Sequence, residues 1–286
     1  MSGRTRVRKP VVLSIAGSDP GGGAGVQADQ ATIRALGGYP LTVITAITVQ
    51  STRGVRAVEP LPLGLVRAQL AELVADCRVD AVKIGMLGAP GVLGGVLDLL
   101  APLGGSVPIV LDPVLRSSSG AELVLDDGGR SGGQSAEVAI VAALPRLRLI
   151  TPNAAELGRL AAAAGGPKDA TRVEDRLASL HARGAMAVLL TGGDESGPEA
   201  VDLLAVRGRP MHRFASPRVA STASHGTGCT LSSAIAVGLA RGEPLVTAIE
   251  AAKRYVAGAI AAGDGFRVGA GPDPLDHDWS RVERAD

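Results

Sequence analysis

Aromatic side chains are almost absent from this chain of 286 residues, which contains two Tyr, two Phe and one Trp. Proteins that bind single-stranded nucleic acid usually stack the bases on aromatic rings, so we do not expect that function here. Hydrophobic residues nevertheless make up 46% of the sequence. The core must therefore be built mainly from Ala, Val, Leu and Ile.

Cysteines are equally scarce, because Cys77 and Cys229 are the only two in the chain. Two cysteines do not make a disulfide framework in a protein of this length, which favours a reducing, cytoplasmic location. The four histidines are scattered and show no zinc-site spacing with the cysteines. They are His181, His212, His225 and His277.

An excess of either charge is also missing, since 29 Lys and Arg residues balance 28 Asp and Glu residues. Such a balance offers no basic patch to nucleic acid or to a membrane surface. No apolar run is long enough to span a bilayer. The segment Val11–Ala16 follows a basic N-terminus but is shorter than the apolar stretch of a signal peptide. We expect neither a nucleic-acid partner nor a membrane.

Short β-branched segments alternate with longer helical ones along the chain. Strands are predicted at Val11–Ala16, Leu41–Val49, Ala81–Ile84, Ile109–Leu111, Leu147–Ile150 and Ala187–Leu190. Helices are predicted at Val26–Leu36, Leu63–Cys77, Gly91–Leu100, Ala136–Ala143, Ala154–Ala163 and Thr171–Arg183. This order predicts an α/β fold in which helices cover both faces of a mainly parallel sheet.

The later part of the chain predicts a hairpin and two more helices. The hairpin strands are Ala200–Val206 and Met211–Ala215, and the helices are Gly228–Ala240 and Leu245–Ala262. We assign residues 11–265 to a single domain, residues 1–10 to an N-terminal extension and residues 266–286 to a polar C-terminal tail that frays. The Gly- and Ser-rich segment 126–135 could be a domain linker, but similar strands continue on both sides and favour a surface insertion.

The most informative segment is Ser-His-Gly-Thr-Gly-Cys-Thr at residues 224–230, directly before an apolar helix. Gly226 and Gly228 allow a tight turn, and the N–H groups of a first helical turn attract phosphate. Cys229 lies at the same helix start, where the pKa of a thiol is lowered. An anion pocket beside a candidate proton acceptor suggests phosphoryl transfer. The alternative is an ordinary glycine-rich helix entry with a buried cysteine.

A second glycine-rich loop joins the first predicted strand to the first predicted helix. Its residues 23–28, Gly-Ala-Gly-Val-Gln-Ala, match the dinucleotide fingerprint G-x-G-x-x-A. However, Gly23 lies far beyond the end of the strand, and the next strand ends at Val49-Gln50 without a carboxylate for a ribose. An NAD-dependent oxidoreductase is therefore disfavoured. A phosphate-binding P-loop is missing as well, since none of the four lysines precedes Ser or Thr.

Three residues are candidates for binding a flat heterocyclic ring. The amide of Gln50, at a strand end, offers one donor and one acceptor side by side, which matches the edge of an aminopyrimidine. Asp29 could accept a hydrogen bond from a ring amino group, and Met86 could cover the ring with its polarizable thioether. Each has a plainer alternative: a polar strand terminus for Gln50, a solvated helix face for Asp29 and core packing for Met86.

Polar residues follow several neighbouring strands. Asp112 follows the strand Ile109–Leu111, and Asn153 and Glu156 follow the strand that ends at Ile150. Such groups could hold a hydrated Mg²⁺ beside a triphosphate. Asn153 and Glu156 could equally form a helix capping box, and the two uses are compatible. Thr191, Gly192 and Gly193 continue this row of loops.

Together these motifs resemble the hydroxymethylpyrimidine/phosphomethylpyrimidine kinases of thiamin biosynthesis, a family within the ribokinase-like superfamily. The resemblance runs from about Val11 to about Ala262. It is carried by residues 15–20 with 22–29, 43–46, 83–87, 111–114, 150–153 with Glu156, and 225–232, which occur in the family's order.

The resemblance implies a single three-layer α/β/α domain, commonly dimeric, that uses ATP and Mg²⁺ to phosphorylate an aminopyrimidine hydroxymethyl group and then the monophosphate. It implies that Gly226, Thr227 and Gly228 form an anion hole, and that Cys229 replaces the Asp base of most relatives. The pyrimidine-contacting positions would be Gly17, Ala24, Asp29, Gln50, Met86 and Val114. The ATP side would include Asp112, Asn153, Glu156, Thr191 and Gly193, with Asp112 and Glu156 as metal ligands.

One segment departs from the family pattern. Relatives usually have Lys-Gly-Gly-His where this chain has Thr191-Gly192-Gly193-Asp194. The lysine would neutralise the charge of the transferring phosphate, so its loss bears on the rate and above all on the second phosphorylation. Arg116 stands where a small or apolar residue is common, and we hypothesise that it supplies the missing cation.

Two further functions stay open at this point. A pyridoxal or pyridoxine kinase would use the same scaffold, but pyridoxal lacks the aminopyrimidine edge that Gln50 matches. A non-catalytic pyrimidine-binding protein would keep the pocket and lose the chemistry, and Thr191 is the residue that keeps this alternative open.

Overall fold

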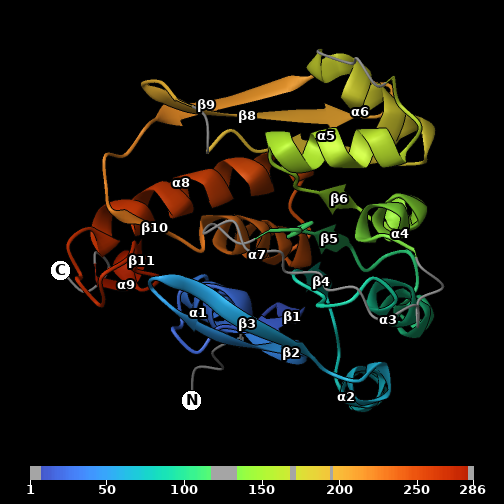
Figure 1. The fold of residues 1–286 in the computed structure, drawn as a ribbon, viewed down its shortest axis with the longest axis horizontal. Coiled ribbons are helices and arrows are strands. Elements are labelled where there is room, and N and C mark those ends of the chain that lie inside the picture. Colours follow the sequence, from blue (N-terminus) through green and yellow to red (C-terminus); the bar gives the residue numbers. More distant parts are fainter. Residues whose placement is uncertain (1–7, 117–133, 168–171, 194–195, 283–286) are drawn as a thin grey trace, which may run out of the picture.

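The main sheet of the protein has nine strands. The computed structural model describes residues 8–116, 134–167, 172–193 and 196–282. The strands are β1 Val11–Ser18, β2 Tyr39–Ser51, β3 Gly54–Pro60, β4 Ala81–Ile84, β5 Ile109–Leu111, β6 Leu149–Ile150, β7 Ala187–Leu190, β8 Glu199–Val206 and β9 His212–Pro217. Their order in the sheet is β3-β2-β1-β4-β5-β6-β7-β8-β9 (Figure 1).

The sheet is parallel in its centre and antiparallel at both edges. Strands β2, β1, β4, β5, β6 and β7 run parallel to one another, whereas β3 pairs antiparallel with β2, β8 with β7, and β9 with β8. Parallel neighbours need crossover connections, and the chain supplies them as helices. The predicted α/β fold with a mainly parallel sheet is confirmed.

Helices cover both faces of the sheet. One layer contains α1 Gly25–Ala35, α7 Thr227–Ala240 and α8 Leu245–Gly263. The other contains α2 Leu63–Asp76, α3 Val92–Leu100, α4 Ala136–Ala143, α5 Ala154–Ala163 and α6 Val173–Ala182. Short 3₁₀ turns follow α3 at Ala101–Leu103 and α4 at Leu144–Arg146. The fold is therefore the three-layer α/β/α arrangement that the family resemblance implies.

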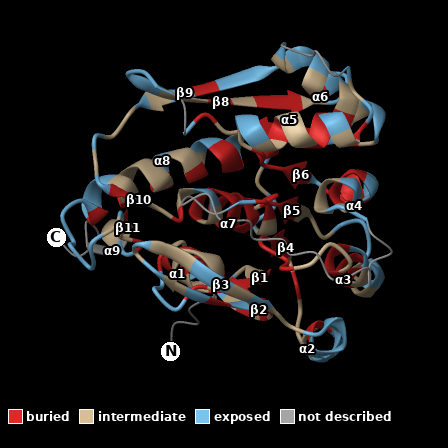
Figure 2. Ribbon diagram, viewed as in Figure 1, coloured by how far each residue is buried: buried red, intermediate tan, exposed pale blue. Residues whose placement is uncertain are grey.

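The core forms on both faces because side chains alternate along the strands. Leu13 and Ile15 of β1 pack toward the α2–α6 layer, whereas Val12 packs toward α7 and α8. Helix α7 is buried from Thr230 to Leu239, as the red ribbon in Figure 2 shows. The core is aliphatic, as the composition predicts. The N-terminus of this buried helix therefore lies near the centre of the molecule.

Strand β3 was not among the predicted elements. It pairs antiparallel with β2 through a two-residue connection, Thr52-Arg53. All its residues are exposed or half-buried, so it lacks the buried β-branched run by which the other strands were predicted. The signal that marks it is a short turn followed by Gly54, whose φ of 123° suits glycine.

The prediction of a frayed C-terminus is wrong for the described residues. Asp273–Pro274 forms β11, which pairs with β10, Ala223–His225, and the short helix α9 follows at Trp279–Val282. Leu275 and His277 are buried, and the Tyr255 hydroxyl donates to the His277 carbonyl oxygen at 2.7 Å. The C-terminal segment is thus held against β10, directly before α7.

The domain boundaries at residues 11 and 265 remain proposals. The insertion predicted at residues 126–135 falls largely outside the described residues. Among the helices of the described ranges, none combines the length and apolar character that crossing a membrane requires.

Candidate active site

A cleft of about 950 Å³ opens at the carboxyl ends of the parallel strands. It is of the size that small-molecule sites commonly have. Of the residues predicted to form the site, only Asp29 does not line it. Those that do are Gly17, Ala24, Gln50, Met86, Asp112, Val114, Arg116, Asn153, Glu156, Thr191, Gly193, Gly226, Thr227, Gly228 and Cys229.

The start of α7 has the geometry of an anion site. Gly226 is the N-cap residue and has a left-handed φ of 89°. The first intrahelical bond runs from the Thr230 N–H to the Gly226 carbonyl oxygen at 2.9 Å. Thr227, Gly228 and Cys229 come before Thr230 in the first turn. Their N–H groups therefore have no carbonyl acceptor within the helix. They lie at the positive end of the helix dipole, inside the cleft.

The expected low pKa of Cys229 is wrong for this structure. Burial raises the pKa of the thiol to about 11, although the positive charge of Lys83 acts in the opposite direction. The helix start alone would favour a thiolate, but desolvation outweighs it here. Without bound ligands, Cys229 is therefore a neutral thiol at neutral pH.

This raised pKa predicts slow alkylation of Cys229. In a Cys77→Ser variant, which leaves Cys229 as the only cysteine, about one thiol in a thousand is ionised at pH 8. Iodoacetamide should therefore modify it about 100-fold more slowly than it modifies free cysteine. The rate should still rise between pH 9 and 10, whereas a plateau below pH 9 would show a lowered pKa. The urea-unfolded chain is the control and should react like free cysteine.

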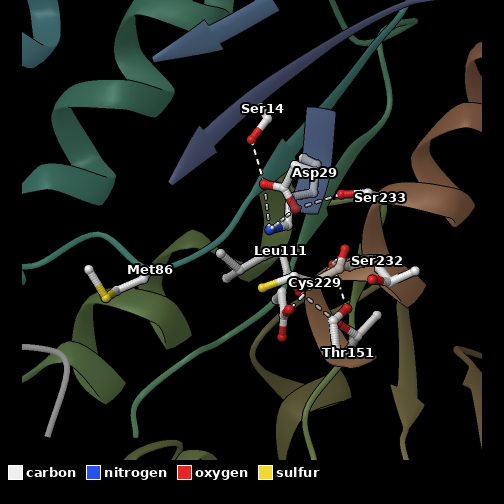
Figure 3. Close-up of polar contacts among 12 residues, drawn as sticks. Ser14, Asp29, Met86, Leu111, Thr151, Cys229, Ser232 and Ser233 are labelled. Carbon is white, nitrogen blue, oxygen red and sulfur yellow. Dashed lines mark hydrogen bonds and ion pairs between the residues drawn. The ribbon is translucent and has the colours of Figure 1, made fainter. Parts of the chain in front are cut away.

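Asp29 is not in the cleft, which contradicts its predicted contact with the pyrimidine. The side chain is fully buried and pairs with Lys83, whose Nζ lies 2.8 and 2.9 Å from the two carboxylate oxygens. The hydroxyls of Ser14 and Ser233 also donate to it, at 2.5 and 2.8 Å (Figure 3). The cluster joins β1, α1, β4 and α7. The Asp29 carboxylate is therefore neither on a solvated helix face nor in the cleft. Through Ser233 it connects α7 to the buried Ser14 and Lys83 of the sheet.

Asp112 lies beside the anion site at the end of β5. Its Oδ2 accepts a hydrogen bond from the Ser232 hydroxyl of α7 at 3.3 Å. Burial raises the pKa of Asp112 to about 6, although the nearby Lys83 charge lowers it. The carboxyl is therefore mostly ionised at neutral pH and places negative charge at the cleft wall near Gly228.

The capping interpretation of Asn153 and Glu156 is confirmed. Oδ1 of Asn153 accepts from the Glu156 N–H at 2.9 Å, and Oε2 of Glu156 accepts from the Asn153 N–H at 3.0 Å. The second oxygen of Glu156 accepts from the Leu115 N–H at 3.4 Å. Both residues still line the cleft, so capping fixes them there without removing them from it.

Gln50 and Met86 lie on the part of the cleft formed by β2 and the first loop. Met86 packs against Ala46 and Val114 and is 8% exposed. The amide nitrogen of Gln50 lies 3.1 Å from Nε2 of His225. Gln50 and Met86, two of the three side chains predicted to bind a ring, thus share one cavity with the start of α7.

Several lining residues have no counterpart in the sequence prediction. Lys253 of α8 pairs with Asp202 at 2.7 Å, and the other oxygen of Asp202 accepts from the Gly192 N–H. Arg218 donates to the Gly193 carbonyl oxygen at 2.7 Å. Both contacts fix the loop after β7. These contacts cannot be predicted from local sequence, because the partners come from distant elements. The one local signal is Asp202, an acidic residue inside the mainly apolar pattern of β8. Apolar lining is added by Val219, Leu231, Val256, Ala257 and Ile260.

Comparison of the sequence with known proteins gives a consistent result. A family model described as phosphomethylpyrimidine kinase matches residues 19–276. A hydroxymethylpyrimidine/phosphomethylpyrimidine kinase from Streptomyces coelicolor is 42% identical over 277 residues, which cover 97% of each chain. A thiamine biosynthesis bifunctional protein from Geobacter sulfurreducens is 41% identical over 266 residues, which are 93% of this chain and 52% of that protein.

Comparison of the fold points to the same group of enzymes. The pyridoxal kinase from Staphylococcus aureus in complex with AMP-PCP superimposes with a TM-score of 0.80. The match covers 96% of this chain and 95% of that structure, at 27% identity. Sequence identity is thus clearly higher toward the pyrimidine kinase than toward this pyridoxal kinase.

Proposed function

Since the chain belongs to the phosphomethylpyrimidine kinase family, we propose that it phosphorylates 4-amino-5-hydroxymethyl-2-methylpyrimidine and then its monophosphate. It is an ATP-dependent phosphotransferase of thiamine biosynthesis. The observation that carries this function is one cleft that holds both a ring-binding corner, with Gln50 and Met86, and the anion site at the start of α7.

The transferring phosphate is proposed to sit at the start of α7. The amides of Thr227, Gly228 and Cys229 donate to its oxygens and stabilise the charge that develops there. Phosphoryl transfer passes through a loose transition state, so catalysis consists mainly of positioning and charge stabilisation. Asn153, Thr191 and Gly193 are proposed to border the rest of the nucleotide, whose flat base packs against Val219 and the apolar face of α8.

Cys229 is proposed to contact the hydroxyl group of the substrate. Because its pKa is about 11, the protein does not rest with a thiolate base in place. A loose transition state requires little removal of the hydroxyl proton before the phosphate bond breaks. A neutral thiol that orients the hydroxyl is therefore compatible with the chemistry, and a Cys229→Ser variant with undiminished turnover would reject any role for the sulfur.

The carboxylates of the cleft fit a hydrated Mg²⁺ ion better than a metal that is enclosed entirely by protein ligands. Asp112 and Glu156 both line the cleft and offer the oxygen donors that Mg²⁺ prefers. Within the described part of the chain, no three His, Cys, Asp or Glu side chains gather into a metal site. This suits an ion that keeps several waters and is bound partly by phosphate. Asp112 and Glu156 would hold it, and the ion would neutralise charge on the triphosphate.

Two proposals concern the setting of the enzyme. The chain forms a homodimer, for which the exposed Ile47 and Val49 of β2 offer apolar surface; sedimentation velocity measures the mass. The protein works in the cytoplasm, where Cys77 and Cys229 stay reduced.

The function is tested by incubating the protein with ATP, Mg²⁺ and the pyrimidine alcohol, followed by mass analysis. We expect the monophosphate first and then the diphosphate, with one ADP formed for each phosphate transferred. A competition with pyridoxal separates the nearest alternative, and preferential phosphorylation of pyridoxal would contradict the proposal. Binding of the pyrimidine without ADP formation would instead show a non-catalytic relative.

Arg116 is predicted to provide the cation that Thr191 does not. It is exposed and lines the cleft. Arg116→Ala should lower kcat about 10- to 100-fold and slow the second phosphorylation most, because charge on the phosphoryl group loses a partner. Arg116→Lys keeps the charge and should retain part of the activity.

The matched control for Arg116 is Arg56→Ala, on the exposed strand β3 outside the cleft. It should leave both phosphorylation rates unchanged. Product formation in single turnovers measures the two steps separately. Wild-type rates in Arg116→Ala would end the hypothesis.

A further inference from the structure

A hydrogen-bonded chain of three side chains crosses the ring-binding corner of the cleft. Nε2 of His225 lies 3.0 Å from Oδ2 of Asp19 and 3.1 Å from the side-chain amide nitrogen of Gln50. All three residues line the cleft. The chain therefore connects the loop after β1, the turn before α7 and the end of β2 at the point where a ring would bind.

Asp19 is firmly fixed at one end of this chain. Its side chain is 4% exposed, and its two oxygens also accept from the N–H groups of Gly21 and Ala24 at 2.8 and 2.9 Å. Burial would raise the pKa of Asp19, but the hydrogen bonds from His225 and from these two amides lower it. Asp19 is thus a carboxylate that only accepts.

The imidazole is held in place by the backbone around it. A Cβ atom at Gly23 would lie 2.3 Å from Cδ2 of His225. The ring therefore rests directly on the main chain of the first loop, a contact that only glycine permits. Because the ring is seated against the backbone and bonded to Asp19, its Nε2 has one orientation.

The proton arrangement of this chain follows from its geometry. Nε2 of His225 cannot donate to Asp19 and also accept from the amide of Gln50. A carboxylate at 3.0 Å requires the proton to lie on Nε2, since a lone pair there would face the negative oxygen. Two donors would face each other if the Gln50 nitrogen stayed 3.1 Å from an Nε2–H. The amide orientation compatible with the Nε2–H is the reverse one, in which the Gln50 carbonyl oxygen faces His225 and shares that proton with Asp19 in a three-centre bond. The NH₂ group then points away from the imidazole.

We propose that His225 is a positioning residue for substrate recognition, which orients the side-chain amide of Gln50 so that its NH₂ group donates to an unprotonated ring nitrogen. This inference rests on the proposed function and specifies how the pyrimidine is recognised. The Gln50 oxygen has a second lone pair, which accepts from an amino group next to that nitrogen. The ligand class is an aromatic heterocycle that carries an acceptor nitrogen beside an amino group. A ring without this pair loses one or both bonds.

The test is a double-mutant cycle on His225 and Gln50. The variants are His225→Phe, which keeps a ring but removes Nε2–H, Gln50→Ala, and the double variant. We expect His225→Phe to raise KM for the pyrimidine alcohol about tenfold, with kcat and the KM for ATP changed less than about twofold. In the Gln50→Ala background the same substitution should have no further effect on KM, because His225 acts through Gln50.

A conservative variant separates positioning from folding. His225→Gln carries a nitrogen donor at about the reach of Nε2 and should recover most of the lost affinity, whereas His225→Asn is too short and should not. Thermal unfolding of each variant verifies that it is folded. If the effects of His225→Phe and Gln50→Ala multiply, or if the KM for ATP rises equally, His225 only shapes the loop and the inference is overturned.

Calorimetric binding of the pyrimidine alcohol without ATP distinguishes this failure from failure of the proposed function. If the wild type binds the alcohol but forms no phosphate, the kinase function fails while the cycle can still be measured from Kd. If the wild type turns over normally and the cycle shows no coupling, only the role of His225 fails. Absence of both binding and turnover overturns both.

Discussion

Gly226→Ala should lower kcat about 100- to 1,000-fold, the loss expected when preorganised donors to a transition state are displaced. Gly226 has a φ of 89°, a backbone conformation that is strained for any residue other than glycine. An added Cβ would lie 1.8 Å from the carbonyl oxygen of Gly23. The clash is with main chain and cannot be relieved by turning a side chain. The turn must move, and the amides of Thr227 and Gly228 move with it.

Gly242→Ala is the matched control for this prediction. Gly242 follows α7 at its other end, has nearly the same φ of 80° and has no atom within 4 Å of an added Cβ. It should cost about 1 kcal/mol of stability through its backbone conformation and leave kcat unchanged. Steady-state kinetics and thermal unfolding of both variants make the comparison. Near-normal turnover in a folded Gly226→Ala protein would contradict a phosphate site at this turn.

Lys83→Met should destabilise the protein by about 3–5 kcal/mol, the usual cost of removing one partner from a buried ion pair. Both side chains of the Lys83–Asp29 pair are fully buried, so the substitution leaves a carboxylate without its cation in a region of low dielectric. The hydroxyls of Ser14 and Ser233 remain as its donors. They do not compensate a full charge. Urea unfolding measures the change in free energy.

An exposed ion pair with the same geometry provides the control. Arg213 and Glu199 also meet at 2.8 Å, but their side chains are 55% and 51% exposed. Arg213→Met should cost less than about 1 kcal/mol, because water screens this pair. The double variant Lys83→Met/Asp29→Leu removes both charges and should be more stable than Lys83→Met alone. Equal, small losses for Lys83→Met and Arg213→Met would show that the buried pair does not hold α7.

The sequence predicts the centre of the fold well because that information is local. Runs such as Ala81–Ile84 and Ala187–Leu190 are strands by their own composition, and both appear as β4 and β7. Strand β3 and the docked segment from Asp273 to His277 depend instead on partners far away in the sequence. Exposed edge strands and polar terminal segments carry no such local signal.

The cleft residues can likewise be predicted from the sequence where their signal is local. Turn motifs and strand ends identify the cleft residues, because a parallel sheet gathers these loops at one edge. The prediction that Asp29 contacts the pyrimidine is wrong, although the sequence carries a signal for its burial. Val26, Asp29 and Ile33 recur at helical spacing on one buried face of α1. A lysine inside the apolar strand Ala81–Ile84 was the matching signal. The pKa of Cys229 depends on desolvation by the packed structure, which no motif specifies.

A crystal structure with the pyrimidine alcohol and the non-hydrolysable ATP analogue AMP-PCP would show directly whether the terminal phosphate binds at the start of α7. We expect oxygens of the terminal phosphonate to lie within hydrogen-bonding distance of the main-chain nitrogens of residues 227–229, facing the hydroxymethyl group. A terminal group bound elsewhere, with those nitrogens making no contact to it, would show that the start of α7 is not the phosphate site.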